Sequence, residues 1–458
     1  MPFPILGSNS AVAGYEIDNS IRMDGTANFS DYTFGTSTNV RKRTINFWVK
    51  RSKINDSAGQ VVLRCEESDG SGGSLLFQGE GSGVGSNDQL FISNRNATTG
   101  SSDYGVRTNR LFRDVAAWYN IHIEYDTTQS TASNRIKIYV NGVQETSLAQ
   151  TDYPSQNYDT TSFLGGTTTS HEIGRGAPTG SVNYFKGYFS NFAFVDGTAL
   201  DPTSFGEFND NGVWVPINPL QQSINFGNVG FFLEFKQSGS NQNASGQGAD
   251  TSGNDNHLNP NNMGTEDTTT DTPTNNFCTL NPLDPNRGDD LSEGNTQYVS
   301  PSSARENIRG TFGVTSGKWY YEVKQTTSNG STNVGVSIEG VNLDDSLGKD
   351  NFGWAYQSSG SKRHNNSTES YGDTYTGNDI IGVALDLDNH ELFFYKNGTA
   401  QNSGTKAYDL DTGETYFPIF GSGSLSTSDT FQANFGNAPF TISSGNSDAN
   451  GYGNFEYA

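Results

Sequence analysis

The stretch D-I-I-G-V-A-L-D-L-D-N-H-E-L-F-F-Y-K-N-G, residues 379–398, predicts two strands joined by a tight turn. Apolar residues recur at every second position from Ile381 to Leu387, which is the period of a pleated strand. Asp388-Asn389-His390 suits a turn, because Asp and Asn tolerate a left-handed backbone and bond their own main chain. Leu392–Tyr395 resumes as a second strand, and Asn397-Gly398 is a strong hairpin signal. We therefore expect this stretch to lie inside a β-sandwich.

The composition of the whole chain extends this expectation to an all-β protein. With 458 residues the chain is too long for one ordinary core, so two or three domains are expected. Hydrophobic residues make up only 32%, but aromatic residues reach 12%, whereas disordered chains are poor in them. The 54 glycines favour turns and weaken helix interiors. Together these values indicate many short strands joined by long polar loops.

The net charge of −23 argues against nucleic-acid binding, because phosphate contacts need clustered Lys and Arg. The same acidity leaves room for divalent cations. Cys65 and Cys278 lie far apart in the sequence, and we expect both to be buried free thiols.

The first residues, M-P-F-P-I-L-G-S-N-S, have neither a basic start nor a long apolar run, so no signal peptide is predicted. No stretch reaches the roughly 18 apolar residues of a membrane helix. We expect synthesis and folding in a cytosol and no membrane insertion. Residues 1–14 read as an extended arm, which either packs on its own domain or docks on a neighbouring subunit.

Residues 15–219 form a strand-rich block. Clear strands are expected at Ile45–Lys50, Trp118–Asp126, Arg135–Val143 and Tyr184–Phe194. The order W-V-K, W-Y-N-I-H-I-E-Y-D, I-Y-V-N-G, I-G-R and F-K-G-Y-F-S-N-F resembles a laminin-G-type, concanavalin A-like lectin/glucanase sandwich. The segments Y-P-S-Q-N-Y-D-T (153–160) and F-V-D-G-T-A-L-D-P (194–202) are similar to modules in virion proteins of marine bacteriophages.

Residues 220–285 are rich in Gly, Asn, Ser and Thr, and we expect an ordered connector. Its first strand, at Phe231–Phe235, belongs either to the connector or to a sandwich. Within it, D-T-S-G-N-D-N-H (250–257) resembles a segment that opens laminin-G-like domains. Residues 286–441, with G-K-W-Y-Y-E-V, I-G-V-A-L-D-L-D-N, F-Y-K-N-G and N-F-G-N-A-P-F in this order, resemble a SPRY (B30.2-like) domain. Residues 442–458 form a tail that is either loosely attached or a docking strand. The fold expected from these resemblances is two concanavalin A-like, jelly-roll antiparallel sandwiches joined by the connector.

Glycoside hydrolases of the concanavalin-like class need two carboxyl groups about 5 Å apart. Glu16-Ile17-Asp18 begins like their E-x-D-x-x-E motif, but the third acid would fall at Ile21. Asp386, Asp388 and Glu391 fit the spacing better, yet the turn at Asp388-Asn389 would put Glu391 on the next strand. We therefore predict no catalytic residues.

Calcium is the candidate cofactor, and no other is required. Laminin-G-like domains often hold Ca²⁺ at a loop rim through carboxylate and carbonyl oxygens. Two acidic clusters have suitable oxygen density, namely Asp409, Asp411 and Glu414, and Asp250 with Asp255. The alternative is that both are solvated acidic turns.

Sugar sites pair an aromatic plane with polar side chains, and SPRY relatives bind partners through loops at one edge of the sandwich. We predict Tyr356, Arg363, His364 and Tyr371 as surface-reading residues around a rare basic cluster, Lys362-Arg363-His364. The alternative is that Tyr371 belongs to the core and the loop is merely solvated. Weaker candidates lie in the first domain at Tyr153, Tyr158 and His171, whereas Trp48, Trp118 and Trp319 alternate within strands and are expected in the core.

The resemblances imply a bacteriophage structural protein on the virion surface, either a tail-fibre-like adhesin or a capsid decoration or head fibre. Its expected partners are host-surface glycans or proteins and neighbouring virion proteins, bound without catalysis, with a homo-oligomer expected and a trimer favoured. The alternatives are a virion-associated polysaccharide-degrading glycoside hydrolase and an intracellular SPRY-type protein-recognition module.

Overall fold

Strands and connecting turns make up the structure, a computed structural model that describes residues 14–33, 35–66, 72–79, 87–95, 102–160, 163, 170–176, 183–284, 290–327 and 331–457. No α-helix occurs in these ranges, where short 3₁₀ turns are the only helical elements. None of the described residues forms a helix long and apolar enough to cross a membrane. The predicted all-β class is confirmed, while the predicted arm at 1–14 lies, apart from Gly14, outside the described residues.

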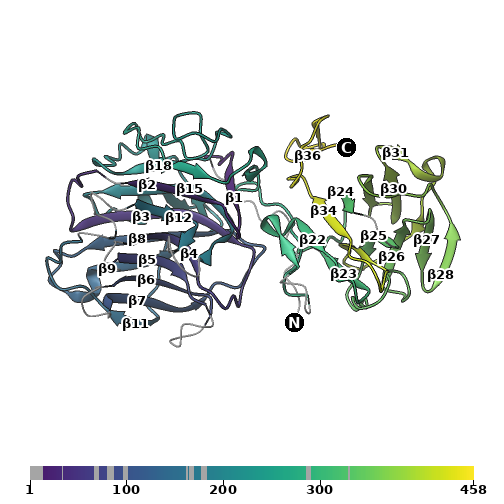
Figure 1. Ribbon diagram of the computed structural model, residues 1–458, viewed down its shortest axis with the longest axis horizontal. Coiled ribbons are helices and arrows are strands. Elements are labelled where there is room, and N and C mark those ends of the chain that lie inside the picture. Colours follow the sequence, from purple (N-terminus) through teal and green to yellow (C-terminus); the bar gives the residue numbers. More distant parts are fainter. Residues whose placement is uncertain are drawn as a thin grey trace. The chain divides into compact units, whose positions relative to one another are not determined.

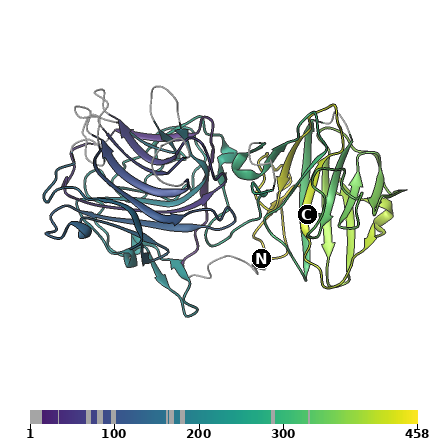
Figure 2. The same ribbon diagram turned by 90° about the horizontal axis from the view of Figure 1, so that it is seen from below.

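The chain divides into two units, and the boundary in the sequence lies between Asn276 and Phe277. The N-terminal unit is a sandwich of two eight-stranded antiparallel sheets (Figures 1 and 2). We name each sheet after a central strand. The β3 sheet contains β10 (Val143–Gln144), β9 (Ile136–Val140), β8 (Tyr119–Asp126), β3 (Lys42–Arg51), β15 (Lys186–Asp196), β1 (Ser20–Asp24) and β20 (Thr268–Thr269), with β18 (Phe231–Leu233) paired to β15.

The β5 sheet forms the other layer of this unit. Its order is β11 (Leu148–Asp152), β7 (Ser102–Leu111), β6 (Gln89–Arg95), β5 (Gly72–Phe77), β4 (Gln60–Glu66), β12 (Ser170–Ile173), β2 (Phe29–Thr33) and β19 (Asn259–Asn261). Side chains from both sheets fill one core, for example Phe47 and Val49 of β3 with Leu75 and Phe77 of β5. Alternation along each strand places these apolar residues on the shared inner face.

The C-terminal unit is a second sandwich. The β24 sheet contains β21 (Leu291–Ser292), β22 (Gln297–Val299), β34 (Thr430–Asn434), β24 (Lys318–Thr327), β29 (Ile380–Asp386), β30 (Glu391–Lys396) and β31 (Thr399–Ala400), with β32 (Tyr408–Asp409) paired to β30. The β25 sheet contains β23 (Glu306–Arg309), β33 (Phe417–Ser422), β25 (Thr332–Ser337), β26 (Gly353–Gln357), β27 (Ser361–His364) and β28 (Ser367–Ser370).

The 379–398 stretch forms the predicted hairpin of β29 and β30, in which Asp386 lies opposite Glu391. Ile381, Val383 and Leu385 are buried in the core of this unit. Asn397 and Gly398 have φ of 47° and 76° and turn the chain into β31, as the Asn-Gly signal predicts for a turn with two left-handed residues.

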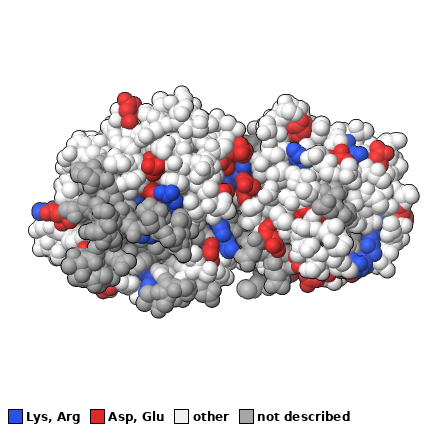
Figure 3. All heavy atoms as spheres, viewed as in Figure 1, with Lys and Arg blue, Asp and Glu red and all other residues white. Residues whose placement is uncertain are grey.

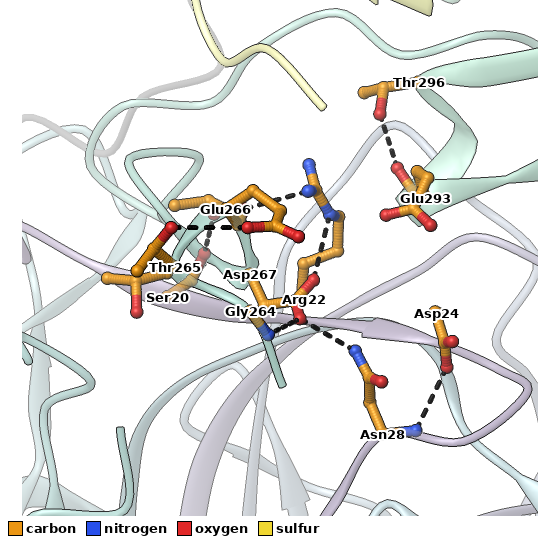
Figure 4. Close-up of polar contacts among 12 residues, drawn as sticks. Ser20, Arg22, Asp24, Asn28, Gly264, Thr265, Glu266, Asp267, Glu293 and Thr296 are labelled. Carbon is orange, nitrogen blue, oxygen red and sulfur yellow. Dashed lines mark hydrogen bonds and ion pairs between the residues drawn. The ribbon is translucent and has the colours of Figure 1, made fainter. Parts of the chain in front are cut away.

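The predicted connector differs from the structure, because residues up to Asn276 belong to the N-terminal unit. Besides the anticipated strand β18, β19 pairs with β2 and β20 pairs with β1. Buried charges fix the segment: Asp267 lies 3.7 Å from Arg22 and Asp271 lies 2.8 Å from Lys50. Figure 4 shows Asp267 accepting a hydrogen bond from Asn28 beside Arg22. After Phe235 few apolar side chains of this segment, Leu258 and Met263 among them, enter the core, so its sequence lacks a strand-like hydrophobic period.

Three further expectations concern single residues. Trp48 and Trp118 are 4% and 8% exposed, so their prediction as core residues is confirmed. Trp319 is 50% exposed, and its prediction as a core residue is wrong because it stands at the start of β24, beyond the buried middle of that strand. Cys65 and Cys278 are both buried free thiols, as predicted.

Candidate binding surfaces

The two tyrosines of the C-terminal unit that were predicted to contact a ligand are core residues. Tyr356 and Tyr371 are 0% and 7% exposed. Their hydroxyl groups donate to the Gln401 side-chain oxygen at 3.1 Å and to the Thr405 carbonyl at 3.0 Å, respectively. Burial raises the pKa of Tyr371 to about 12. Both tyrosines are therefore unavailable to a surface ligand, which corrects the prediction.

The basic residues expected on a loop lie instead on strand β27, and the pleat of that strand separates them. Lys362 lies opposite Tyr356 on the core-facing side, whereas Arg363 lies opposite Ala355 on the other side. The Lys362 ammonium donates to the Ala407 carbonyl at 2.8 Å. Since neighbours in a strand point to opposite faces, the three residues do not form the single basic cluster that the sequence suggested.

His364 and Arg363 remain partly exposed. The His364 ring stacks on Trp354, with centroids 4.7 Å apart and planes 9° apart, and its Nδ1 lies 2.9 Å from the Gly353 carbonyl. Arg363 donates to the Asn366 side chain at 2.9 Å. His364 therefore packs against the edge of the core, and only Arg363 keeps an outward position suited to a partner.

The aromatic candidates of the N-terminal unit are partly buried against its core. The Tyr158 hydroxyl donates to the Asp103 carboxylate at 2.8 Å and accepts from the Asn94 amide at 3.0 Å. Burial and the Asp103 carboxylate raise the pKa of Tyr158 well above its usual value. Burial also raises the pKa of Tyr153. His171 is 2% exposed and cannot meet a surface ligand.

Asp250 uses its carboxylate to organise its own loop. The two oxygens accept from the backbone N–H groups of Phe232, Ser252 and Asn256 at 2.8, 2.8 and 2.9 Å. The Asp255 side chain is 90% exposed. N–H groups compete with a cation for the same lone pairs, so Asp250 is poorly placed as a calcium ligand here.

The second acidic cluster is open to solvent. Asp409 accepts from the Lys406 ammonium at 2.5 Å, and Asp411 and Glu414 are exposed. Within the described ranges, no group of three or more His, Cys, Asp or Glu side chains is arranged to hold a metal ion.

The acids of the 379–398 hairpin are paired with basic or amide groups. Asp386 contacts Lys318 and accepts from the Asn389 amide at 2.9 Å, and these hydrogen bonds lower the pKa of Asp386 to about 2. Glu391 lies 2.9 Å from the Lys406 ammonium. A general acid of a glycosidase needs a raised pKa. This geometry therefore favours a structural role for the hairpin acids.

The structure brings together a set of residues that sequence reasoning missed. One residue from each of the eight strands of the β5 sheet lies opposite the next, forming a row across the whole sheet. In order this polar row is Asp152, Gly105, Ser93, Ser74, Arg64, Glu172, Asp31 and Asn259. At about 4.8 Å per strand, the row spans roughly 34 Å.

The polar row faces away from the core. Its sequence neighbours Leu75, Ile92 and Tyr104 are core residues, and alternate residues point to opposite faces. At one end the Asp31 carboxylate accepts from the side-chain amides of Asn259 and Asn261, at 3.0 and 2.5 Å. This end of the row offers fixed carboxylate and amide groups at the surface.

An aromatic ring lies beside the polar row. Phe91 pairs with Leu76 on one side and Arg107 on the other, and the Arg107 guanidinium lies 5.6 Å from its ring centroid. Phe91 is partly exposed. An apolar plane on the same sheet face as carboxylate, amide, hydroxyl and guanidinium groups matches the two-sided chemistry of a sugar ring. The alternation in each strand was visible in the sequence, but the register that aligns the strands was not.

Trp319 is the other surface feature that the sequence did not reveal. Its indole N–H donates to the Ser316 carbonyl at 2.8 Å, which fixes the ring while it stays half exposed. Exposed tryptophans often anchor protein interfaces.

Over the face shown in Figure 3, charged side chains are scattered and opposite charges often lie together.

Comparison with known proteins identifies both sandwiches. Residues 23–203 match the concanavalin A-like lectin/glucanases superfamily, and residues 318–438 match the SPRY domain. The N-terminal unit therefore contains a laminin-G-like domain and the C-terminal unit a SPRY domain, as the motifs implied.

The curated relatives share only part of this chain. The ATP-dependent RNA helicase DDX1 of Xenopus laevis is 43% identical over 90 residues, which are 20% of this chain and 12% of the helicase. Ddx1 of Drosophila melanogaster is 32% identical over 166 residues, covering 34% of this chain and 22% of the helicase. The E3 ubiquitin-protein ligase RKP of Arabidopsis thaliana is 32% identical over 142 residues, covering 30% and 10%. The chain thus spans less than a quarter of the length of these relatives.

Two solved structures are also similar to part of the chain. The SPRY domain of human HERC1 is 22% identical, with a TM-score of 0.27, and the match covers 30% of this chain and 87% of that domain. Stonustoxin is 24% identical, with a TM-score of 0.28, covering 34% of this chain and 27% of the toxin.

Proposed function

We propose that this chain is a non-catalytic binding protein with two recognition modules. The N-terminal sandwich binds a glycan along the polar row of the β5 sheet, and the SPRY domain binds a protein partner. The observation that carries the proposal is the row of eight aligned positions beside Phe91, because a polysaccharide needs an extended polar track with an apolar plane.

The setting we propose is the surface of a bacteriophage particle, as a tail-fibre-like adhesin or a capsid decoration. This setting rests on the resemblance of segments 153–160 and 194–202 to phage virion modules and on the net charge of −23, which favours solubility at high copy number. Proteomics and immunogold labelling of purified particles test this setting, and absence of the chain from intact particles would refute it.

Binding to glycans is tested with the full-length protein on an array of bacterial surface polysaccharides. Asp31→Ala and Phe91→Ala should each weaken binding at least about tenfold, since each removes an interaction worth more than 1.4 kcal/mol. Trp319→Ala, in the other unit, is the matched control and should leave glycan binding unchanged. Equal binding by all variants would refute the polar row as the site, and release of reducing ends would identify a hydrolase instead.

A second candidate is an intracellular protein-recognition module, favoured by the SPRY match of residues 318–438 and by the similarity of part of this chain to parts of an RNA helicase and a ubiquitin ligase. Affinity capture that enriches one defined peptide motif, through a contact abolished by Trp319→Ala and without particle association, would support it.

A further inference from the structure

The C-terminal segment lies on the outer face of the β24 sheet. Strand β36 (Asn454–Phe455) pairs with β35 (Asn446–Ser447) to form a small hairpin (Figure 1). The Asn454 N–H donates to the Gly436 carbonyl at 2.9 Å, and the Asn434 amide donates to the Asn454 carbonyl at 3.0 Å. The sequence left open whether residues 442–458 are loosely attached or form a docking strand. In the described part of this tail, the chain is docked on its own unit.

One buried carboxylate receives the end of this segment. Glu322 is 0% exposed, and it lies between the core residues Tyr321 and Val323 in sequence, so its side chain points to the outer face. One oxygen accepts from the Glu456 backbone N–H at 3.0 Å and the other from the Tyr457 N–H at 2.7 Å. A single side chain therefore accepts hydrogen bonds from two successive backbone amides.

Two aromatic side chains of the segment also contact this face of the sheet. The Phe455 ring is 3% exposed and stands edge-on to Tyr320, with centroids 5.3 Å apart. A side chain at Gly398 would begin 2.8 Å from the Tyr457 ring, so glycine leaves the room that this ring occupies. We call Glu322, Tyr320, Asn434, Gly436 and Gly398 the tail seat.

The hairpin also has hydrogen bonds of its own, apart from those to the seat. Within it, the Glu456 carboxylate accepts from the Ser443 N–H at 2.7 Å, and the Asn446 amide donates to the Glu456 carbonyl at 2.6 Å. Asp448 accepts from the N–H groups of Asn450 and Gly453, both at 2.8 Å. These bonds are internal to the hairpin, so none of them is lost when the hairpin leaves the seat.

We propose that the tail seat is a peptide-binding site, filled by the Phe455-Glu456-Tyr457 segment of its own chain and able to take the same segment of a second copy. The described contacts between the seat and the segment are to backbone amides, aromatic rings and a backbone carbonyl, and a second copy supplies all of them equally. Exchange of an identical element between protomers is a low-cost route to assembly. This inference is independent of glycan binding by the other unit.

The intramolecular segment has the advantage of a short tether, which gives it a millimolar effective concentration. Dilute wild-type protein should therefore hold its own tail. Exchange becomes observable when the intramolecular contact is weakened, or when copies are crowded together.

The test uses full-length protein and a fluorescent synthetic peptide with the sequence of residues 442–457, which contains the whole hairpin. Phe455→Ala weakens the tail and keeps the seat, so it should bind the peptide at least about tenfold more tightly than the wild type does. Adding Glu322→Gln should abolish this binding, and a peptide with alanine in place of its phenylalanine should not bind. No binding of the peptide to Phe455→Ala would overturn the proposal.

A second arm examines exchange between whole chains. The Glu322→Gln variant has an intact tail and an impaired seat, whereas the Phe455→Ala variant has an intact seat and an impaired tail. In an equimolar mixture the intact tail should occupy the intact seat, giving a one-to-one complex in sedimentation that neither variant forms alone. A mixture that sediments as the sum of its monomers would contradict exchange. Tyr457→Ala, which alters a residue 37% exposed, replaces Phe455→Ala in both arms if the latter fails to fold.

Discussion

The ammonium of Lys50 lies 2.8 Å from the carboxylate of Asp271 inside the N-terminal unit, with both side chains only 1% exposed. Lys50 is on β3, and Asp271 belongs to the segment expected to be a connector. The other Asp271 oxygen accepts from the Trp118 indole N–H at 3.0 Å. These contacts hold the segment that contains Asp271 against the sandwich.

Removing one partner of this pair should be costly, because it leaves a buried charge without its counter-charge. We expect Asp271→Ala to lower the free energy of unfolding by about 3–5 kcal/mol in urea titrations. Replacing both partners, as Lys50→Met with Asp271→Leu, should recover most of the loss. Asp159→Ala, which breaks the exposed pair with Arg41, is the matched control and should change stability little. An equal loss in both single variants would contradict this account.

His122 should make the N-terminal unit sensitive to acid. Burial lowers the pKa of His122 to about 4, whereas an unfolded histidine titrates near 6.5. Since the folded state prefers the neutral ring, stability is full above pH 6.5 and falls as the pH drops towards 4, by roughly 3 kcal/mol. A His122→Gln variant should lack this part of the pH dependence in unfolding experiments. An NMR titration of His122 with a midpoint near 6.5 would show the prediction to be wrong.

The two tryptophans of the C-terminal unit should differ in their effect on stability. Trp354 is 2% exposed and Trp319 is 50% exposed. Trp354→Ala should cost about 3–5 kcal/mol through the cavity it leaves, while Trp319→Ala should cost much less. Thermal unfolding of both variants compares them directly, and similar melting temperatures would mean that the exposed ring carries hidden packing energy.

Asp250 should contribute to stability without calcium. Asp250→Ala leaves the N–H groups of Phe232 and Asn256 without their acceptor, at a cost of about 1–3 kcal/mol for each that stays buried. The wild-type melting temperature should be the same in EDTA and in millimolar Ca²⁺. A calcium-dependent rise that Asp250→Ala abolishes would instead establish the calcium site at Asp250 and Asp255.

The sequence predicted those parts of the fold that depend on local rules. The alternation at Ile381–Leu387 and the Asn397-Gly398 turn defined a hairpin whose strands the structure reproduces. The motif orders implied the laminin-G-like and SPRY domains, which the comparisons confirm. Strand period and turn chemistry are properties of a few adjacent residues, so they can be read without any knowledge of tertiary contacts.

The candidate sites were harder to predict, because exposure depends on what packs above a strand. Tyr356 and Trp319 both follow strand patterns, yet one is fully buried and the other half exposed. Lys362 and Arg363 are adjacent in sequence, but β27 sends them to opposite faces.

By itself the sequence determined the all-β class and the main turns, because these follow from composition and residue spacing, and its motifs carried the resemblance to the two sandwich types. Only the tertiary structure decided where Asp267 and Asp271 belong, which side chains line the polar row, and that Glu322 holds the Phe455-Glu456-Tyr457 segment. These features join residues far apart in the sequence, and the segment of Asp267 and Asp271 makes a still longer-range contact, the Ile17–Thr274 hydrogen bond across 257 positions. Their physical basis is strand register and the pairing of buried charges, and both are set by long-range packing.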